Sequence, residues 1–148
     1  AYANELGIAN EDIWVDPVLM PVGIDQRQIA AYMDFVRMLP DIVPGAKCTC
    51  GLSNLSYGVP KDLRGLLNRT FLVMIDRIGQ PSAIVSGFDE ELIRLIRGDL
   101  PDLVNLIYRA MDEDDVDLTG LSPKEVEYVK TTNVLMGRSL FSSSWLEV

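Results

Sequence analysis

Short apolar segments that alternate with amphipathic helix patterns constrain the fold of this chain more than any other feature. The predicted strands are residues 13–16, 46–50 and 82–86, about 35 residues apart. The predicted helices that follow them are residues 25–39, 62–78 and 89–97. Strands and helices that alternate in this order are typical of α/β proteins with a parallel sheet. The sequence therefore predicts a series of β–α units.

Residues near the ends of these segments predict where the helices begin and end. Asp25 and Asp89 are expected to cap the first and third helices, and Pro40 is expected to break the chain after the first. Trp14 lies inside the first strand and is expected in the core.

The C-terminal third of the chain follows a different pattern. Residues 99–111 are predicted to be helical, and an acidic run at 112–117 is expected to be a solvated loop because it lacks EF-hand spacing. Ser122, Pro123 and Glu125 are the cap, first turn and capping-box partner of a further helix. We therefore divide the chain into β–α units (1–98), a helical and acidic insertion (99–131) and a C-terminal helix and tail (132–148).

Composition excludes several classes of function. The 148 residues carry a net charge of −9 and no histidine. Such a chain is poorly suited to bind nucleic acid or an anionic membrane, and it cannot use a histidine base or metal ligand. No apolar run reaches the roughly 18–20 residues of a membrane span. Cys48 and Cys50 share one face of a strand and are expected to be packing residues of a reduced, cytoplasmic protein without a tightly bound metal.

Three parallel strands make too small a sheet to stand alone, because parallel sheets are covered on both faces. The chain also begins without Met, inside a helical pattern. We therefore expect it to be part of a larger barrel or to pair with another chain.

The run of residues 50–60 carries the clearest functional pattern. The strand at 46–50 is followed by Gly, Ser and Asn residues, which places polar atoms at its carboxyl end. Ligands of parallel α/β proteins bind at this end of the strands. The amide of Asn54 both donates and accepts hydrogen bonds, which suits recognition of a heterocyclic nitrogen.

Three segments together resemble the pterin-binding methyltransferases, most closely the methyltetrahydrofolate:corrinoid/iron-sulfur protein methyltransferases. These segments are residues 14–21 (WVDPVLMP), 51–56 (GLSNLS) and 67–72 (LNRTFL), and the resemblance resumes at 132–137 (TNVLMG). The family fold is a (β/α)8 TIM barrel. The resemblance implies that the chain is its C-terminal part, about strands 6–8 with their helices, and that a helical insertion lies near the C-terminus.

The same resemblance implies roles for individual residues. Asp16 matches an Asp that accepts hydrogen bonds from the pterin ring, and Asn54 matches a catalytic Asn that contacts N5 of the folate. Arg64 matches a further Arg, and Tyr57 stands where the family has Gln. Gly51 and Ser53 complete the substrate-binding set, because they lie in the same motif as Asn54.

The resemblance also implies the reaction and its partners. A methyl group would pass from methyltetrahydrofolate to the cobalt of a corrinoid (cobalamin) bound to a partner protein. The enzyme is expected to be a homo-oligomer or to pair with an N-terminal half of the barrel.

Two other functions are open on the sequence. One is a non-catalytic subunit or docking module that uses its acidic insertion to bind a partner. The other is a different folate-site barrel such as a dihydropteroate synthase, but that family needs a Lys and an Arg-x-His arrangement, and this chain has no histidine.

Overall fold

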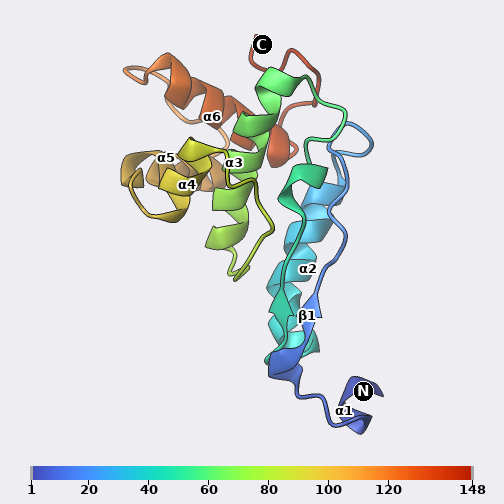
Figure 1. The fold of residues 1–148 in the computed structure, drawn as a ribbon. Helices are drawn as coiled ribbons and strands as arrows, with labels where there is room; N and C mark the ends of the chain where they lie inside the picture. The colour runs from blue at the N-terminus through green and yellow to red at the C-terminus, as the bar shows by residue number, and fades with distance from the viewer. Residues whose placement is uncertain (1, 148) are drawn as a thin grey trace.

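The computed structural model describes residues 2–147, and Ala1 and Val148 lie outside the described part. Helices dominate this part of the chain (Figure 1). The helices are α1 (Tyr2–Glu5), α2 (Gln28–Ile42), α3 (Lys61–Arg77), α4 (Glu90–Ile96), α5 (Pro101–Asp112) and α6 (Pro123–Leu135). The strands are β1 (Trp14–Val15) and β2 (Lys47–Cys48), and 3-10 turns form at η1 (Asn10–Asp12) and η2 (Leu52–Asn54).

The first two predicted strands pair in parallel, as expected. Trp14 lies opposite Lys47 and Val15 opposite Cys48. The Lys47 N–H donates to the Ile13 carbonyl at 2.9 Å, and the Thr49 N–H donates to the Val15 carbonyl at 3.0 Å. The first two β–α units therefore lie side by side, and the carboxyl ends of their strands are at the same end of the sheet.

The strand predicted at 82–86 is reduced to a single parallel bridge between Gly51 and Ile84. The Ile84 N–H donates to the Cys50 carbonyl at 2.7 Å, and the Leu52 N–H donates to the Ile84 carbonyl at 3.1 Å. The Ser82 carbonyl, which would extend this pairing, instead accepts the Gln80 side-chain amide at 2.9 Å. The segment turns again at Ser86, whose carbonyl accepts the Asp89 N–H at 3.4 Å. The position and direction of this segment agree with the prediction, but its length does not.

Helix α2 departs from the prediction at both ends. It begins at Gln28, with Arg27 in the cap position, because the Asp25 carboxylate accepts the Arg27 N–H at 3.0 Å without capping the helix. It ends at Ile42, so Pro40 lies inside the helix and does not precede a break. Pro40 is in the last turn, where it removes one hydrogen bond and the chain can still close on the Leu39 carbonyl.

One face of the strands is covered by α2 and α3. Cys48 and Cys50 are buried on this face, and Tyr32 of α2 packs edge-on against Phe71 of α3, with ring centroids 5.8 Å apart. Trp14 lies on the opposite face because side chains alternate along a strand. The expectation that Trp14 is in the core was wrong: its side chain is 50% exposed, and the Lys47 Nζ lies 5.1 Å from its ring centroid.

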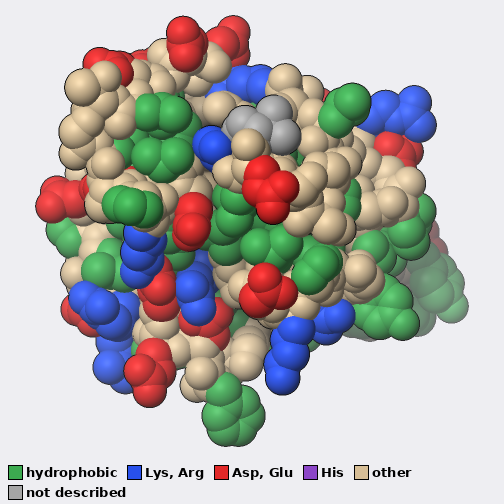
Figure 2. All heavy atoms as spheres, turned by 90° about the horizontal axis from the view of Figure 1, so that it is seen from above, with side chains coloured by type: hydrophobic (Ala, Val, Ile, Leu, Met, Phe, Trp, Pro, Cys, Tyr) green, Lys and Arg blue, Asp and Glu red, His purple; other side chains and the backbone are tan. Residues whose placement is uncertain are grey.

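The strands point toward the upper end of the molecule in Figure 1, and Figure 2 looks directly onto that end. Hydrophobic side chains gather near the centre of this surface and along one side, with acidic and basic groups around them. The polar loops that follow β1 and β2 lie toward this end.

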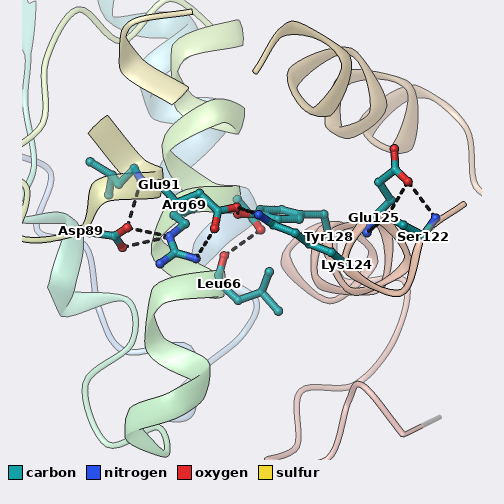
Figure 3. A network of polar contacts seen from close by, with 10 residues as sticks. Leu66, Arg69, Asp89, Glu91, Ser122, Lys124, Glu125 and Tyr128 are labelled. Atoms are coloured by element: carbon teal, nitrogen blue, oxygen red, sulfur yellow. Dashed lines mark hydrogen bonds and ion pairs between the residues drawn. The ribbon is translucent and has the colours of Figure 1, made fainter. Parts of the chain in front are cut away.

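A polar network joins three of the helices in the upper part of the molecule (Figure 3). Arg69 of α3 binds Asp89 at 2.8 Å and Glu91 of α4 at 3.1 Å. From α6, the Lys124 Nζ lies 2.6 Å from Glu91, and the Tyr128 hydroxyl donates to Glu91 at 2.9 Å. Glu91 therefore contacts α3 and α6 at once and connects α4 to both.

Helix α6 continues across the boundary placed between residues 131 and 132, so one helix belongs to both of the predicted C-terminal parts. Its predicted capping box is confirmed, with the Ser122 hydroxyl accepting the Glu125 N–H and the Glu125 carboxylate accepting the Ser122 N–H. Just beyond α6, the Arg138 guanidinium donates to the Met111 carbonyl at 2.8 Å and caps the end of α5. Within residues 2–147, no helix is long and apolar enough to cross a membrane.

Candidate functional site

Asp16 follows β1 directly and shapes the loop that leaves it. Its side chain is exposed, and one carboxylate oxygen accepts the Val18 N–H at 2.9 Å. Val18 has a φ of 60°, a left-handed conformation that β-branched residues rarely adopt. The hydrogen bond to Val18 fixes the Asp16 carboxylate in the turn after β1, and its other oxygen accepts no hydrogen bond from the described residues.

Asn54 ends the short η2 turn that follows β2. Its backbone N–H donates to the Gly51 carbonyl at 3.1 Å, so the turn folds Asn54 back over Gly51. A Cβ at Gly51 would lie only 3.3 Å from the Asn54 Nδ2. Asn54 is exposed, and no other described residue hydrogen-bonds to its side-chain amide. The amide is therefore available to a ligand.

The structure places Asp16 and Asn54 at the same edge of the sheet, because β1 and β2 are adjacent and parallel. The two loops are also joined directly, since the Val22 N–H donates to the Leu55 carbonyl at 2.9 Å. This arrangement places one carboxylate acceptor and one amide in the loops that follow two adjacent parallel strands.

The remaining predicted site residues surround this edge in different ways. Ser53 is exposed beside Asn54, and its carbonyl accepts the Ser56 hydroxyl at 3.4 Å. The Tyr57 side chain is 75% exposed and is therefore able to meet a ligand or partner from solvent. Arg64, at the start of α3, donates from Nε to the Val59 carbonyl at 2.7 Å, so it also stabilises the loop before the helix.

A buried polar cluster lies behind the strand ends, on the covered face. The Gln80 amide donates to Cys50 Sγ at 3.3 Å, and its oxygen accepts the Tyr32 hydroxyl at 2.8 Å. Burial raises the pKa of both Cys48 and Cys50, and the nearby Asp16 carboxylate adds to that increase. The cysteines are therefore protonated packing residues. The sequence does not indicate the role of Gln80, because a residue between Gly79 and Pro81 is expected to lie in an exposed turn.

Two hollows lie near the strands. A groove of about 400 Å³ borders the loop after β1 and is lined by Pro17, Val18, Met20, Gln28, Ala31, Tyr32 and Phe35. A pocket of about 300 Å³ lies on the helical side, between α3, the segment at 80–85, α4 and α5. None of the predicted site residues lines either hollow, although Pro17 and Val18, which follow Asp16, line the first. Among residues 2–147, no three His, Cys, Asp or Glu side chains come together in a way that could hold a metal ion.

Comparison with known proteins gives a partial likeness to a methyltransferase. No protein-family model matches the chain. The chain is similar to the methylcorrinoid:tetrahydrofolate methyltransferase of Eubacterium limosum, with 26% identity over 94 residues. The aligned segment is 64% of this chain and 34% of the relative, so the chain spans about a third of that relative's length. This likeness supports a relationship to methyltransferases.

Proposed function

We propose that this chain is part of an enzyme that transfers a methyl group between N5 of tetrahydrofolate and the cobalt of a protein-bound corrinoid. The observation that carries the proposal is the exposed, internally unpaired amide of Asn54, which lies at the same sheet edge as Asp16. The likeness to a methylcorrinoid:tetrahydrofolate methyltransferase supports the same chemistry. In this proposal the β–α units are the C-terminal part of a (β/α)8 barrel, whose ligands bind at the carboxyl ends of the strands.

The reaction places a specific demand on the residue beside N5. When the methyl group leaves, the N5–carbon bond breaks, its electron pair stays on nitrogen, and N5 takes a proton while carbon bonds to reduced cobalt. Asn54 can donate to N5 in one state and accept from the protonated nitrogen in the other, because its amide has both groups. A neutral side chain that follows this change stabilises the transition state electrostatically.

Asp16 has a different task. A carboxylate accepts paired N–H donors, and the aminopyrimidone ring of a pterin offers such a pair. One Asp16 oxygen already accepts the Val18 N–H, which fixes the direction of the carboxylate before the ring binds. Held in this way, the ring presents N5 toward the neighbouring loop that carries Asn54.

The name of the relative gives the corrinoid as methyl donor and tetrahydrofolate as acceptor. The same bonds then form and break in reverse, and the same contacts to N5 serve both directions. The proposal therefore assigns Asn54 and Asp16 the same roles in either direction.

Calorimetric titration with methyltetrahydrofolate tests the proposal. We expect binding by the wild-type chain, loss of binding in Asn54→Ala, and unchanged binding in Asn105→Ala, which removes an exposed amide from α5. In an assembly that catalyses methyl transfer, Asn54→Ala is expected to lower the rate of that transfer by about 10²-fold. Equal folate affinity and equal rate in wild type and Asn54→Ala would refute the assignment.

The alternative of a docking module relied on the acidic run at 112–117. In the structure, Asp112 binds Arg77 at 2.7 Å and Asp114 binds Arg138 at 2.8 Å. Both carboxylates therefore have a partner within the chain, which leaves less free charge for docking. Deletion of residues 112–121 with partner binding unchanged would argue further against this alternative.

A further inference from the structure

The pocket of about 300 Å³ on the helical side of the molecule is not used by the proposed reaction. It is enclosed by α3, α4, α5 and the segment at 80–85, and the three helices lie together on one side of the molecule (Figure 1). Its volume is at the small end of the roughly 300–1,000 Å³ that small-molecule sites occupy. The pocket is therefore large enough for a ligand built around a single ring.

The floor of this pocket is buried and apolar. Val73 and Ile75 of α3 and Leu95 of α4 line it, and all three side chains are buried. Ala83 and Val104 line it beside them and are half-buried. An apolar group that enters the pocket is removed from water together with these side chains, which favours binding.

Gln80 also lines the pocket, but its side chain already has partners. Its amide nitrogen donates to Cys50 Sγ at 3.3 Å and to the Ser82 carbonyl at 2.9 Å. Its oxygen accepts the Tyr32 hydroxyl at 2.8 Å. A ligand therefore cannot bond to the Gln80 amide without replacing one of these partners.

The carboxylate of Asp76 gives the pocket its charge. Of the described residues that line the pocket, Asp76 alone is charged, and it is exposed in the last turn of α3. One carboxylate oxygen accepts the Tyr108 hydroxyl at 3.3 Å, and the other accepts no hydrogen bond from the described residues. The neighbouring Arg77 forms its ion pair with Asp112, at 2.7 Å, and not with Asp76.

We propose that this pocket binds a small amphipathic amine, with its apolar ring on the buried floor and its ammonium group on Asp76. A neutral ligand of the same shape would gain only the burial of its ring, because it could not form a charge-assisted hydrogen bond with the carboxylate. An anion would be repelled by Asp76 and by a chain with a net charge of −9.

This site is independent of the proposed function, since no residue assigned to folate binding lines it. The segment at 80–85 nevertheless belongs to both regions. It forms one wall of the pocket, and its residue Ile84 pairs with Gly51 in the loop that carries Asn54. An amine in the pocket would therefore contact the segment that lies next to the candidate folate site.

Titration of the full chain with benzylamine, followed by proton–nitrogen NMR, tests the proposal. We expect saturable shifts at the amides of Val73, Ala83 and Val104, with a Kd of about 1 mM, as suits a ligand of this size. Benzyl alcohol has the same ring without the charge and is expected to bind about tenfold more weakly.

Two variants separate the charge from the cavity. Asp76→Asn keeps the size of the side chain and is expected to weaken benzylamine binding about tenfold, while benzyl alcohol binds as before. Asp62→Asn is the matched control, because it removes an exposed carboxylate from the first turn of the same helix, outside the pocket, and should bind like wild type. Ala83→Leu fills the pocket and is expected to abolish binding of both probes.

The inference would be overturned if benzylamine showed no saturable binding, or if its shifts were confined to residues outside the pocket. Equal affinity for benzylamine and benzyl alcohol, or equal benzylamine affinity of Asp76→Asn and Asp62→Asn, would also overturn it. Because Asp76 is exposed, Asp76→Asn is expected to fold, and unchanged resonances away from position 76 verify this.

Discussion

At the residue scale, the Asn54 amide lies close to the backbone of Gly51. A Cβ at position 51 would meet the Asn54 Nδ2 at 3.3 Å, while the φ of −79° at Gly51 suits any residue. Gly51→Ala is therefore expected to displace the Asn54 amide without straining the backbone. We predict folate affinity about tenfold lower and an unchanged or slightly higher Tm, since alanine restricts the unfolded chain. Gly87→Ala, where an added Cβ meets nothing within 4 Å, should have a similar effect on Tm and leave the folate affinity unchanged. Unaltered affinity in Gly51→Ala would contradict this view of the site.

Val18 is a second residue whose backbone is under constraint. Its φ of 60° is costly for a β-branched side chain, whereas asparagine adopts this conformation more readily. Val18→Asn is therefore expected to raise the free energy of unfolding by about 1 kcal/mol, measured by urea denaturation. Val18→Thr keeps the β-branch and should have little effect. A loss of stability in Val18→Asn would mean that the Val18 side chain stabilises the loop by more than its backbone conformation costs.

These residues also show what the sequence could predict of the site. Asp16 and Asn54 lie in the loops after β1 and β2, where polar residues that follow an apolar strand are expected, and their roles stay a prediction. The left-handed Val18 could not be found because β-branched residues rarely adopt this conformation. The buried Gln80 could not be found because its partners are distant in sequence. Gln80, for example, bonds to Tyr32 and Cys50, which lie 48 and 30 residues away.

At the scale of secondary structure, local patterns predicted two of the three helix caps correctly, but they predicted the lengths of helices and strands poorly. The Asp89 and Ser122 caps are confirmed because their partners lie three residues along the chain. The third strand is short and α2 runs past Pro40 because pairing and packing, which local sequence does not encode, decide those lengths. Trp14 was misplaced because an apolar residue in a strand gives no indication of which face will be covered.

The Glu91 network offers a prediction about how the helices are held together. Burial pushes the pKa of Glu91 upward, but hydrogen bonds from Lys124 and Tyr128 and the charge of Arg69 hold it below its ordinary value. A carboxylate with a lowered pKa stabilises the fold above its unfolded pKa of about 4.3, and this contribution is lost as pH falls below that value.

Glu91→Gln is therefore expected to lower the free energy of unfolding by about 1–3 kcal/mol at pH 7, because Arg69 loses a charged partner. The difference from wild type should shrink as pH falls below about 4. Thermal unfolding of both proteins between pH 3 and 7 measures this. Glu90→Gln changes the exposed neighbour in the same helical turn and should leave stability nearly unchanged. A Glu91→Gln deficit that is constant over this pH range would show that the ionised state of Glu91 is not what stabilises the helices.

At the scale of the whole molecule, the order of elements was predictable but their assembly was not. The C-terminal segment was expected to be a tail behind an insertion. In the structure it returns to the first β–α unit, where Gln26 receives it. The Gln26 amide donates to the Val134 carbonyl at 2.6 Å and to the Ser139 carbonyl at 2.7 Å, and its oxygen accepts the Phe141 N–H at 3.0 Å. One side chain therefore joins segments more than a hundred residues apart, which no local pattern could indicate.

This connection predicts a distinct effect of Gln26→Ala. Three backbone groups lose their partner, so the free energy of unfolding should fall by about 1–2 kcal/mol. Hydrogen exchange at the Phe141 amide should become faster, because the C-terminal segment is no longer tied to the loop before α2. Gln28→Ala is the matched control, since Gln28 donates to the Met20 carbonyl at 2.9 Å within its own loop. It should lower stability without changing exchange at Phe141. If both variants changed that exchange equally, the tail would be held by the packing of the loop as a whole, and the hydrogen bonds of Gln26 would not be the link between the two ends of the chain.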